Sequence, residues 1–134
     1  LKENEQPLQM SPYADFLGIQ IGKLTAGRAI CSLKLIDHHL NSGGRVHGGV
    51  LTSLADTAAG AAVRTMRPAG KSSATTDLHV AFIRPPLGDV LVADAQVIHA
   101  GSALLRTEIT VCSDDKLVAK ANATFMLVSQ LSKT

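Results

Sequence analysis

Residues 50–66 hold the one long run of helical periodicity in the chain, and this feature restricts the possible folds more than any other. Apolar side chains recur there at intervals of three and four residues, which places them on one face of an α-helix. Pro68 and Gly70 follow and are expected to end the helix. The apolar positions are Val50, Leu51, Leu54, Ala55, Ala58, Ala59, Ala62, Val63 and Met66. A helix with this much apolar surface needs another layer of structure to cover it.

The rest of the chain carries the alternating pattern of β-strands. Two strands are expected after Ile19, with Gly27 in the turn between them. The later strand patterns cover residues 75–83, 90–98, 104–111 and 117–128. Short turn segments join these runs, which suits antiparallel neighbours. The sequence therefore predicts an α+β fold in which one apolar helix packs on one face of an antiparallel sheet.

The chain length sets the domain organisation. A chain of 134 residues fits one domain, which we expect over residues 11–130 after a flexible N-terminal segment over residues 1–10. Residues 11–17 can form a short helix, since a serine is a favourable N-cap and Pro12 a favourable first helical residue. Gly18 is expected to end it.

The charge balance argues against several classes of partner. The formal net charge is only +2 and the basic residues are scattered, so the chain lacks the electrostatic footprint of a nucleic-acid-binding protein. Aromatic residues make up 3% of the chain, which leaves no stacking platform for single strands. No apolar stretch is long enough to span a bilayer and the first residues are polar, so we expect a cytoplasmic protein without a membrane partner.

Neither the cysteines nor the histidines show the spacing of a metal site. Cys31 and Cys112 lie in apolar alternating runs and are expected to be small buried hydrophobic residues. His38, His39 and His47 fall in one loop, where histidines are more often solvated than ligating. We therefore expect no metal and no cofactor.

The segment before the long helix contains Gly48 and Gly49 where a capping residue would normally stand. We expect the first amides of the helix to be uncapped and so available to a ligand. Such amides carry partial positive charge and favour an anion or a developing oxyanion, and glycine allows a ligand to approach closely. The alternative is that the two glycines only permit a tight turn.

Asp56 is an ionisable residue within the otherwise apolar helix, and a buried carboxylate is costly unless it is paired or used. Helical spacing places it on one stripe with small residues, so this side of the helix can admit a close neighbour. The stripe consists of Gly49, Thr52, Ser53, Asp56 and Gly60. The alternative is that Asp56 faces solvent, or that it pairs with Arg64 or Arg67.

The distance between the glycines and Asp56 constrains the assembly. Gly48 and Asp56 are eight residues apart, which is about 12 Å along one helix. An oxyanion donor and a base or nucleophile must both reach one carbonyl group, so a shared site needs Gly48 of one subunit and Asp56 of another. A two-fold dimer supplies two such sites. We therefore expect a homodimer or a dimer of dimers, which is a homotetramer.

Asn41, the run His47-Gly48-Gly49, and Asp56 nine positions after the histidine form a motif. It resembles that of the hotdog-fold acyl-CoA thioesterases of the phenylacetate-degradation (PaaI-like) type, in the 4-hydroxybenzoyl-CoA thioesterase superfamily. The similarity covers nearly the whole chain after residue 10. It implies a long helix wrapped by a curved antiparallel sheet, paired into dimers whose active sites lie at the interface and hydrolyse acyl-CoA thioesters.

The resemblance also implies roles for individual residues. Asp56 would be the general base or the nucleophile, and the Gly48 amide would polarise the thioester carbonyl. His47 and Asn41 would orient the substrate or the attacking water from the subunit opposite Asp56. Thr75 stands at the position of the family's hydroxyl residue, where serine is often found.

The CoA portion of the substrate is expected near the surface. Gly49, Arg84, Gly101 and Ser102 are the candidates for contact with its phosphate or pantetheine groups, and arginine suits a phosphate. The alternative for Arg84 is a solvated residue at the end of a strand. The sequence does not identify the acyl group. Two other functions stay open, namely hydration of an enoyl thioester and acyl-CoA binding without catalysis.

Overall fold

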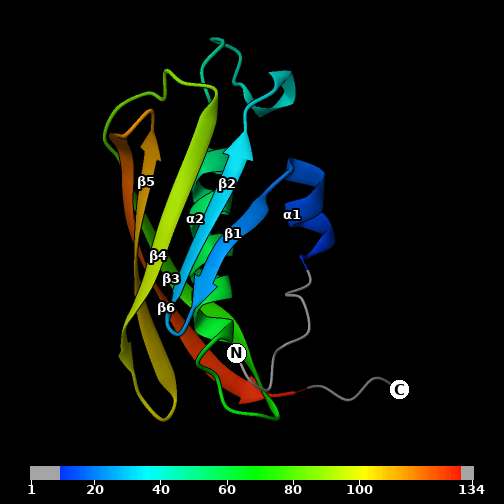
Figure 1. The fold of residues 1–134 in the computed structure, drawn as a ribbon, viewed down its shortest axis with the longest axis vertical. Helices are drawn as coiled ribbons and strands as arrows, with labels where there is room; N and C mark the ends of the chain where they lie inside the picture. Colours follow the sequence, from blue (N-terminus) through cyan, green and yellow to red (C-terminus); the bar gives the residue numbers. More distant parts are fainter. Residues whose placement is uncertain (1–9, 131–134) are drawn as a thin grey trace.

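The computed structural model describes residues 10–130, and Figure 1 shows how its elements are arranged. The flexible segment predicted for residues 1–10 lies, except for Met10, outside the described residues. Within them, two α-helices, α1 (Pro12–Leu17) and α2 (Gly48–Arg64), and a short 3₁₀ turn, η2 (Asp37–His39), accompany six strands. The strands are β1 (Gln20–Thr25), β2 (Arg28–Lys34), β3 (Lys71–Phe82), β4 (Val90–Ala100), β5 (Leu104–Ser113) and β6 (Lys116–Ser129).

The six described strands form one antiparallel sheet in the order β1-β2-β4-β5-β6-β3. The sheet curves around α2, which lies behind β2 and β4 in the view of Figure 1 and contacts every strand. The α+β layout predicted from periodicity is therefore confirmed. β1 and β3 are the edge strands, each with a single neighbour among the described strands.

The shorter elements also follow their sequence signals. Ser11 caps α1, because its Oγ accepts a hydrogen bond from the Ala14 amide at 3.1 Å. Gly18 ends α1 and Gly27 lies in the β1–β2 turn, with positive φ angles of 91° and 76° that favour glycine. β3 begins at Lys71, four residues before its predicted start, because its first residues pair with β6 without an apolar alternation to reveal them.

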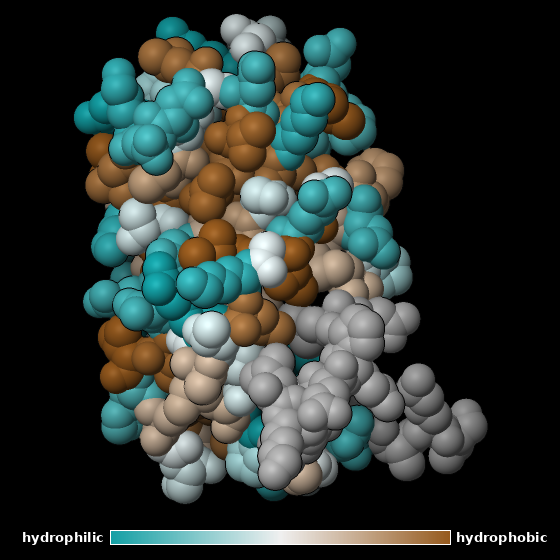
Figure 2. Space-filling view, viewed as in Figure 1, coloured by the Kyte–Doolittle hydropathy of each residue, from teal (hydrophilic) through white to brown (hydrophobic). Residues whose placement is uncertain are grey.

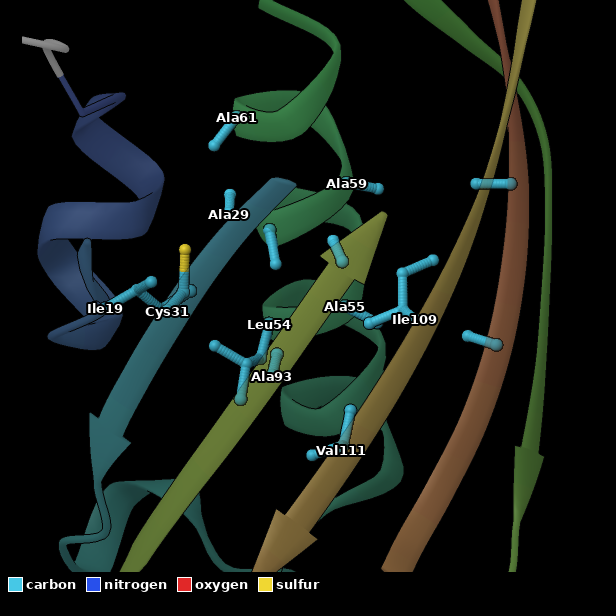
Figure 3. Packing of buried hydrophobic residues seen from close by; sticks show 14 of the residues in the cluster. Ile19, Ala29, Cys31, Leu54, Ala55, Ala59, Ala61, Ala93, Ile109 and Val111 are labelled. Carbon is cyan, nitrogen blue, oxygen red and sulfur yellow. The ribbon is translucent and has the colours of Figure 1, made fainter. Parts of the chain in front are cut away.

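Small side chains bring the helix close to the sheet. Ala55, Ala58, Ala59 and Ala62 of α2 are fully buried. Alanines on the strands belong to the same core, so the two layers can approach closely and pack at the density of a protein interior. The buried strand alanines are Ala29, Ala93, Ala95, Ala119, Ala121 and Ala123. Figure 3 shows the side chains of α2 packed against this layer, which Ile109 and Val111 of β5 complete.

The outer face of the sheet has a mixed character. Figure 2 shows apolar residues separated by polar side chains on the face seen in that view. Exposed apolar residues on the strands include Val92 and Met126, and Arg28 forms an ion pair with Asp94 at 2.7 Å. Exposed ion pairs contribute little to stability. In the part of the chain that the structure describes, no helix is long and apolar enough to cross a membrane.

The two cysteines are free thiols in different surroundings. Cys31 on β2 is fully buried, and burial raises the pKa of its thiol to about 11, so it is a poor nucleophile at neutral pH. Cys112 on β5 is half-buried. The predicted burial is therefore confirmed for Cys31 and only partly met at Cys112.

His39 departs from the prediction that the loop histidines are solvated, because its ring is fully buried. Its Nδ1 accepts a hydrogen bond from the Ile36 amide at 3.0 Å, so the ring proton lies on Nε2, which donates to the Leu17 carbonyl at 2.8 Å. The ring thereby joins the end of α1 to the loop that leads into α2. His38 is exposed, as predicted, and stacks on Phe16.

Replacing His39 with phenylalanine should lower the free energy of unfolding by about 2–4 kcal/mol, because the Ile36 amide and the Leu17 carbonyl both lose their partner. Urea denaturation followed by circular dichroism measures the change. His38→Phe is the matched control and should change stability by less than about 0.5 kcal/mol. An equal loss in both variants would contradict the role of the buried ring.

Candidate functional site

The carboxylate of Asp56 meets the edge strand β3. Asp56 is half-buried on α2, and its Oδ1 accepts a hydrogen bond from the Thr75 hydroxyl of β3 at 2.9 Å. Within residues 10–130, Oδ2 has no hydrogen-bond partner, and Asp56 forms no ion pair with Arg67. Two residues that the sequence singled out on separate elements are thus in contact, and one carboxylate oxygen stays available for chemistry.

A cavity of about 560 Å³ lies beside this pair. Its lining includes Gly60 and Ala61 of α2, Ser73 of β3, Phe125 of β6, and the two arginines Arg64 and Arg67. The small residues that share a stripe with Asp56 are half-buried or exposed, so the sheet of the same protomer does not cover this side of the helix. The arrangement therefore leaves room for a ligand next to the carboxylate.

A β-bulge in β3 determines which side chains reach the cavity. The register with β6 shifts just after Thr75, and Thr76 is the extra residue. Before the bulge, Ser73 and Thr75 line the cavity, whereas after it Leu78 and Val80 pack against the core. If the same sequence paired without a bulge, strict alternation would turn Asp77 and His79 toward the core in place of Leu78 and Val80.

The start of α2 differs from the prediction of two uncapped glycine amides. His47 is the N-cap, and its Nδ1 accepts a hydrogen bond from the Gly49 amide at 2.8 Å. Histidine is not among the residues usually found at N-caps, so sequence reasoning missed this contact. Of the two glycines, only Gly48 has an amide without a hydrogen bond in the described part of the chain. Because Nδ1 is an acceptor, the proton of the neutral His47 ring lies on Nε2.

Asn41 is held in a similar way by the backbone of its own loop. Its Oδ1 accepts hydrogen bonds from the Gly43 amide at 2.9 Å and the Arg45 amide at 3.1 Å. These bonds occupy the acceptor of the side chain and leave its NH₂ group to donate. The loop and the helix start therefore offer three donors, namely the Asn41 NH₂, the His47 Nε2–H and the Gly48 N–H. These three groups are termed the donor end of α2.

The donor end and Asp56 are far apart within one protomer. The Phe82 ring lies over Gly48, since a Cβ added to Gly48 would stand 3.2 Å from Phe82 Cζ. Asp56 instead contacts Thr75, seven residues earlier on β3. The helical rise alone separates Gly48 from Asp56 by about 12 Å. One thioester carbonyl therefore cannot meet both groups of the same protomer.

The residues expected to bind CoA are also separated. Arg84 is exposed just after β3, at the end of the sheet near Gly48. Gly101 and Ser102 lie in the β4–β5 turn at the opposite end, where the Gly101 amide donates to the Leu104 carbonyl at 2.8 Å. A CoA site that uses all of these residues needs two protomers.

Sequence reasoning missed some residues around Asp56 as parts of a site. Arg64 stands two helical turns after Asp56, and Ser73 stands two residues before Thr75 on the same face of β3. The helical and strand spacing alone could therefore have placed both residues beside the site. No local pattern pointed to Phe82, whose contact with the helix start is created by the fold. Within residues 10–130, no group of three His, Cys, Asp or Glu side chains is placed to hold a metal ion.

Comparison with known proteins places this geometry in a family. Residues 43–120 match the Thioesterase superfamily. The chain is 40% identical over 89 residues to the acyl-coenzyme A thioesterase PaaI of Escherichia coli, which covers 66% of this chain and 61% of that protein. The structure of the conserved protein PA5202 from Pseudomonas aeruginosa matches with a TM-score of 0.85 at 34% identity, covering 89% of this chain and 95% of that one. The structure of E. coli PaaI matches with a TM-score of 0.82 at 30% identity, covering 96% and 88%.

The chain belongs to the Thioesterase superfamily and has the hotdog fold, in which an antiparallel sheet curves around one long helix. Within that superfamily it is a thioester hydrolase related to PaaI. The family and the fold class predicted from the motif of Asn41, the glycines and Asp56 are therefore confirmed.

Replacing His47 with alanine should lower the free energy of unfolding by about 1 kcal/mol, because the Gly49 amide loses its cap. His47→Asn should keep most of that stability, since asparagine is a favourable N-cap. Urea denaturation of both variants measures the difference. Identical losses would show that the imidazole does not act as the cap in solution.

Proposed function

We propose that this protein hydrolyses an acyl-CoA thioester to the free acid and CoA at two sites formed between paired protomers. The observation that carries the proposal is the position of Asp56, whose free Oδ2 lies beside a cavity and far from the donor end of its own helix. Each site would take Asp56 and Thr75 from one protomer and the donor end from the other. Two equivalent sites follow from two-fold symmetry.

The edge strand β3 supports this pairing. It is 12 residues long and, among the described strands, it bonds only to β6. A long uncovered edge is a ready site for pairing with another strand. A second copy of β3 on this edge would bring the Asp56 stripe of one helix toward that of the other, and Ser53 and Gly60 on that stripe would allow a close approach.

In this arrangement the donor end acts on the thioester carbonyl. The Gly48 amide would donate to the carbonyl oxygen, and this bond becomes stronger as the oxygen gains negative charge. Asn41 and His47 would orient the thioester or the attacking water through their NH₂ and Nε2–H groups. Backbone contacts fix Asn41 and His47 as donors, and the Gly48 N–H is a donor by nature, so none of the three has to lose a proton during the reaction.

Asp56 supplies the electron pair for the reaction. Thr75 holds Oδ1, so Oδ2 either takes a proton from an attacking water or attacks the carbonyl carbon directly. In both routes the carbon–sulfur bond breaks and the sulfur leaves as the CoA thiol after gaining a proton. Direct attack gives a mixed anhydride, which a water molecule then hydrolyses to the carboxylic acid and restores Asp56.

The pairing also gives the CoA portion a place. The end of one protomer that carries Arg84 would approach the end of its partner that carries Gly101 and Ser102, so that phosphate and pantetheine groups lie between them. Gly49 would contribute only its lack of a side chain, because His47 already binds its amide.

Asp56→Asn should lower kcat by about a hundredfold or more, because the amide can neither accept the proton nor attack the carbonyl carbon. Thr75→Ser should retain most of the activity, whereas Thr75→Val should lose about tenfold, since Oδ1 then lacks its donor. Free-thiol release from a panel of acyl-CoAs measures these rates. Near-unchanged turnover of Asp56→Asn on every substrate would remove Asp56 from the mechanism.

Mixed dimers test whether each site is shared between protomers. Gly48→Pro removes one N–H at the first helical position, where proline is tolerated, and Gly48→Ala is the control that keeps the N–H with a similar contact to Phe82. Gly48→Pro and Asp56→Asn should each be severely impaired alone. Co-expressed in equal amounts, they should recover about a quarter of wild-type activity, because half of the dimers then hold one intact site. If mixing restores no activity, the site lies within one protomer.

The same assays separate the competing functions. Saturable binding of acyl-CoA without thiol release would favour a binding protein, and loss of enoyl absorbance would favour a hydratase. The dimer of dimers and the cytoplasmic location stay predictions. Sedimentation velocity at several protein concentrations distinguishes the dimer from the tetramer.

A further inference from the structure

We propose that the cavity beside Asp56 selects acyl groups that end in a carboxylate, which Arg67 binds with the assistance of Arg64. This inference rests on the proposed thioester hydrolysis and names its substrate class as short dicarboxylic acyl thioesters. The position of the two arginines carries the inference. Both line the same cavity as Asp56, but Arg64 is the last residue of α2 and Arg67 follows the helix.

Strand β3 gives the length of the acyl group. The Thr75 hydroxyl donates to Asp56, and two residues earlier on the same face the Ser73 hydroxyl accepts a long hydrogen bond from Arg67 Nη1 at 3.4 Å. Two residues of a strand span about 7 Å, so the guanidinium lies about that far along β3 from the reactive carboxylate. With carbon–carbon bonds of about 1.5 Å, an acyl group of about four to six carbons bridges the gap.

The cavity between these ends suits a short methylene chain. Gly60 and Ala61 line it from α2, and Ile21 and Phe125 add apolar surface. The glycine leaves space here, because a Cβ added to Gly60 would come into ordinary contact with the Phe125 ring at 3.8 Å. Methylene groups bury their surface favourably in such a stretch.

Arg67 is a half-buried cation close to another cation. Burial lowers its pKa, and the positive charge of Arg64 lowers it further. In residues 10–130, Arg67 has no carboxylate partner, and its hydrogen bond goes to the neutral hydroxyl of Ser73. A bound carboxylate would offset the repulsion between the arginines and accept charge-assisted hydrogen bonds from the guanidinium. A neutral acyl group of the same length would offer the Arg67 guanidinium no such hydrogen bonds.

The phosphates of CoA are the other anionic groups that such a substrate carries. The sulfur is bonded to the reacting carbonyl carbon, and the pantetheine arm that connects it to the phosphates is much longer than the gap of about 7 Å along β3. The gap between Asp56 and Arg67 therefore fits a carboxylate at the end of the acyl group and is too short for the phosphates of CoA.

The test compares glutaryl-CoA with pentanoyl-CoA, whose acyl groups have equal carbon number and differ in the terminal carboxylate. The wild type should show a kcat/KM at least about tenfold higher for glutaryl-CoA. Arg67→Gln should lower this value by about tenfold or more, mainly through KM, and should leave pentanoyl-CoA within about twofold. Arg67→Lys should keep part of the preference, because it keeps the charge. Arg28→Gln on the outer face of the sheet is the control and should alter neither value.

Three results would overturn the inference. An equal loss on both substrates in Arg67→Gln would make the arginine a structural residue. An effect that disappears with the corresponding N-acetylcysteamine thioesters, which lack phosphates, would assign the arginine to CoA. A wild type that cleaves pentanoyl-CoA through Asp56 but shows no preference for glutaryl-CoA would refute the substrate class and leave the proposed hydrolysis intact.

If neither thioester releases thiol, the proposed hydrolysis fails for this class, and titration calorimetry then decides the anion site separately. Tighter binding of glutaryl-CoA than of pentanoyl-CoA by the wild type, lost in Arg67→Gln, would support the site. Equal affinities would overturn it.

Discussion

The close contact between the alanine face of α2 and the curved sheet is the constraint on which the rest of the structure depends. Because Ala55, Ala58 and Ala59 are fully buried against the strands, turning the helix would force larger side chains into the same narrow space. The rotation of α2 is therefore fixed, and with it the direction of Asp56. The side of the helix that the sheet leaves uncovered is the polar, small-residue side, where Asp56 reaches the edge strand β3. Core packing thus determines where the carboxylate and its cavity lie.

Local patterns are enough to predict most of this fold. The intervals of three and four in α2 follow from its single covered face, and the alternation in β4 and β5 follows from a sheet with one face on the core. Asp56 stands out because it is a charge in an apolar helix. Thr75 was found through the resemblance to a family, and the structure brings its hydroxyl to that carboxylate.

Contacts between distant segments could not be predicted in the same way. The buried ring of His39 binds a carbonyl 22 residues earlier in the chain, and nothing near it in the sequence indicates that burial. His47 caps α2 through a ring nitrogen, so the sequence correctly places a donor at Gly48 but wrongly leaves the next amide free. Arg67 lies at the far end of the cavity because β3 places Ser73 there, which depends on strand pairing.

The bulge in β3 has a consequence for which changes this strand can accept. Thr76 shifts the phase of the pleat, so one strand presents hydroxyls to the cavity and then aliphatic side chains to the core. A substitution of Thr76 changes only the side chain at that position, because the number of residues in the strand and the alternation of its inner and outer faces are unchanged. A deletion there would remove the bulge and make the pairing with β6 regular, because Thr75 is opposite Phe125 and Asp77 is opposite the adjacent Thr124. Leu78 and Val80 would then stay on the inner face. An added residue beside the bulge would instead invert the faces of the later residues, so this strand tolerates losing a residue here better than gaining one.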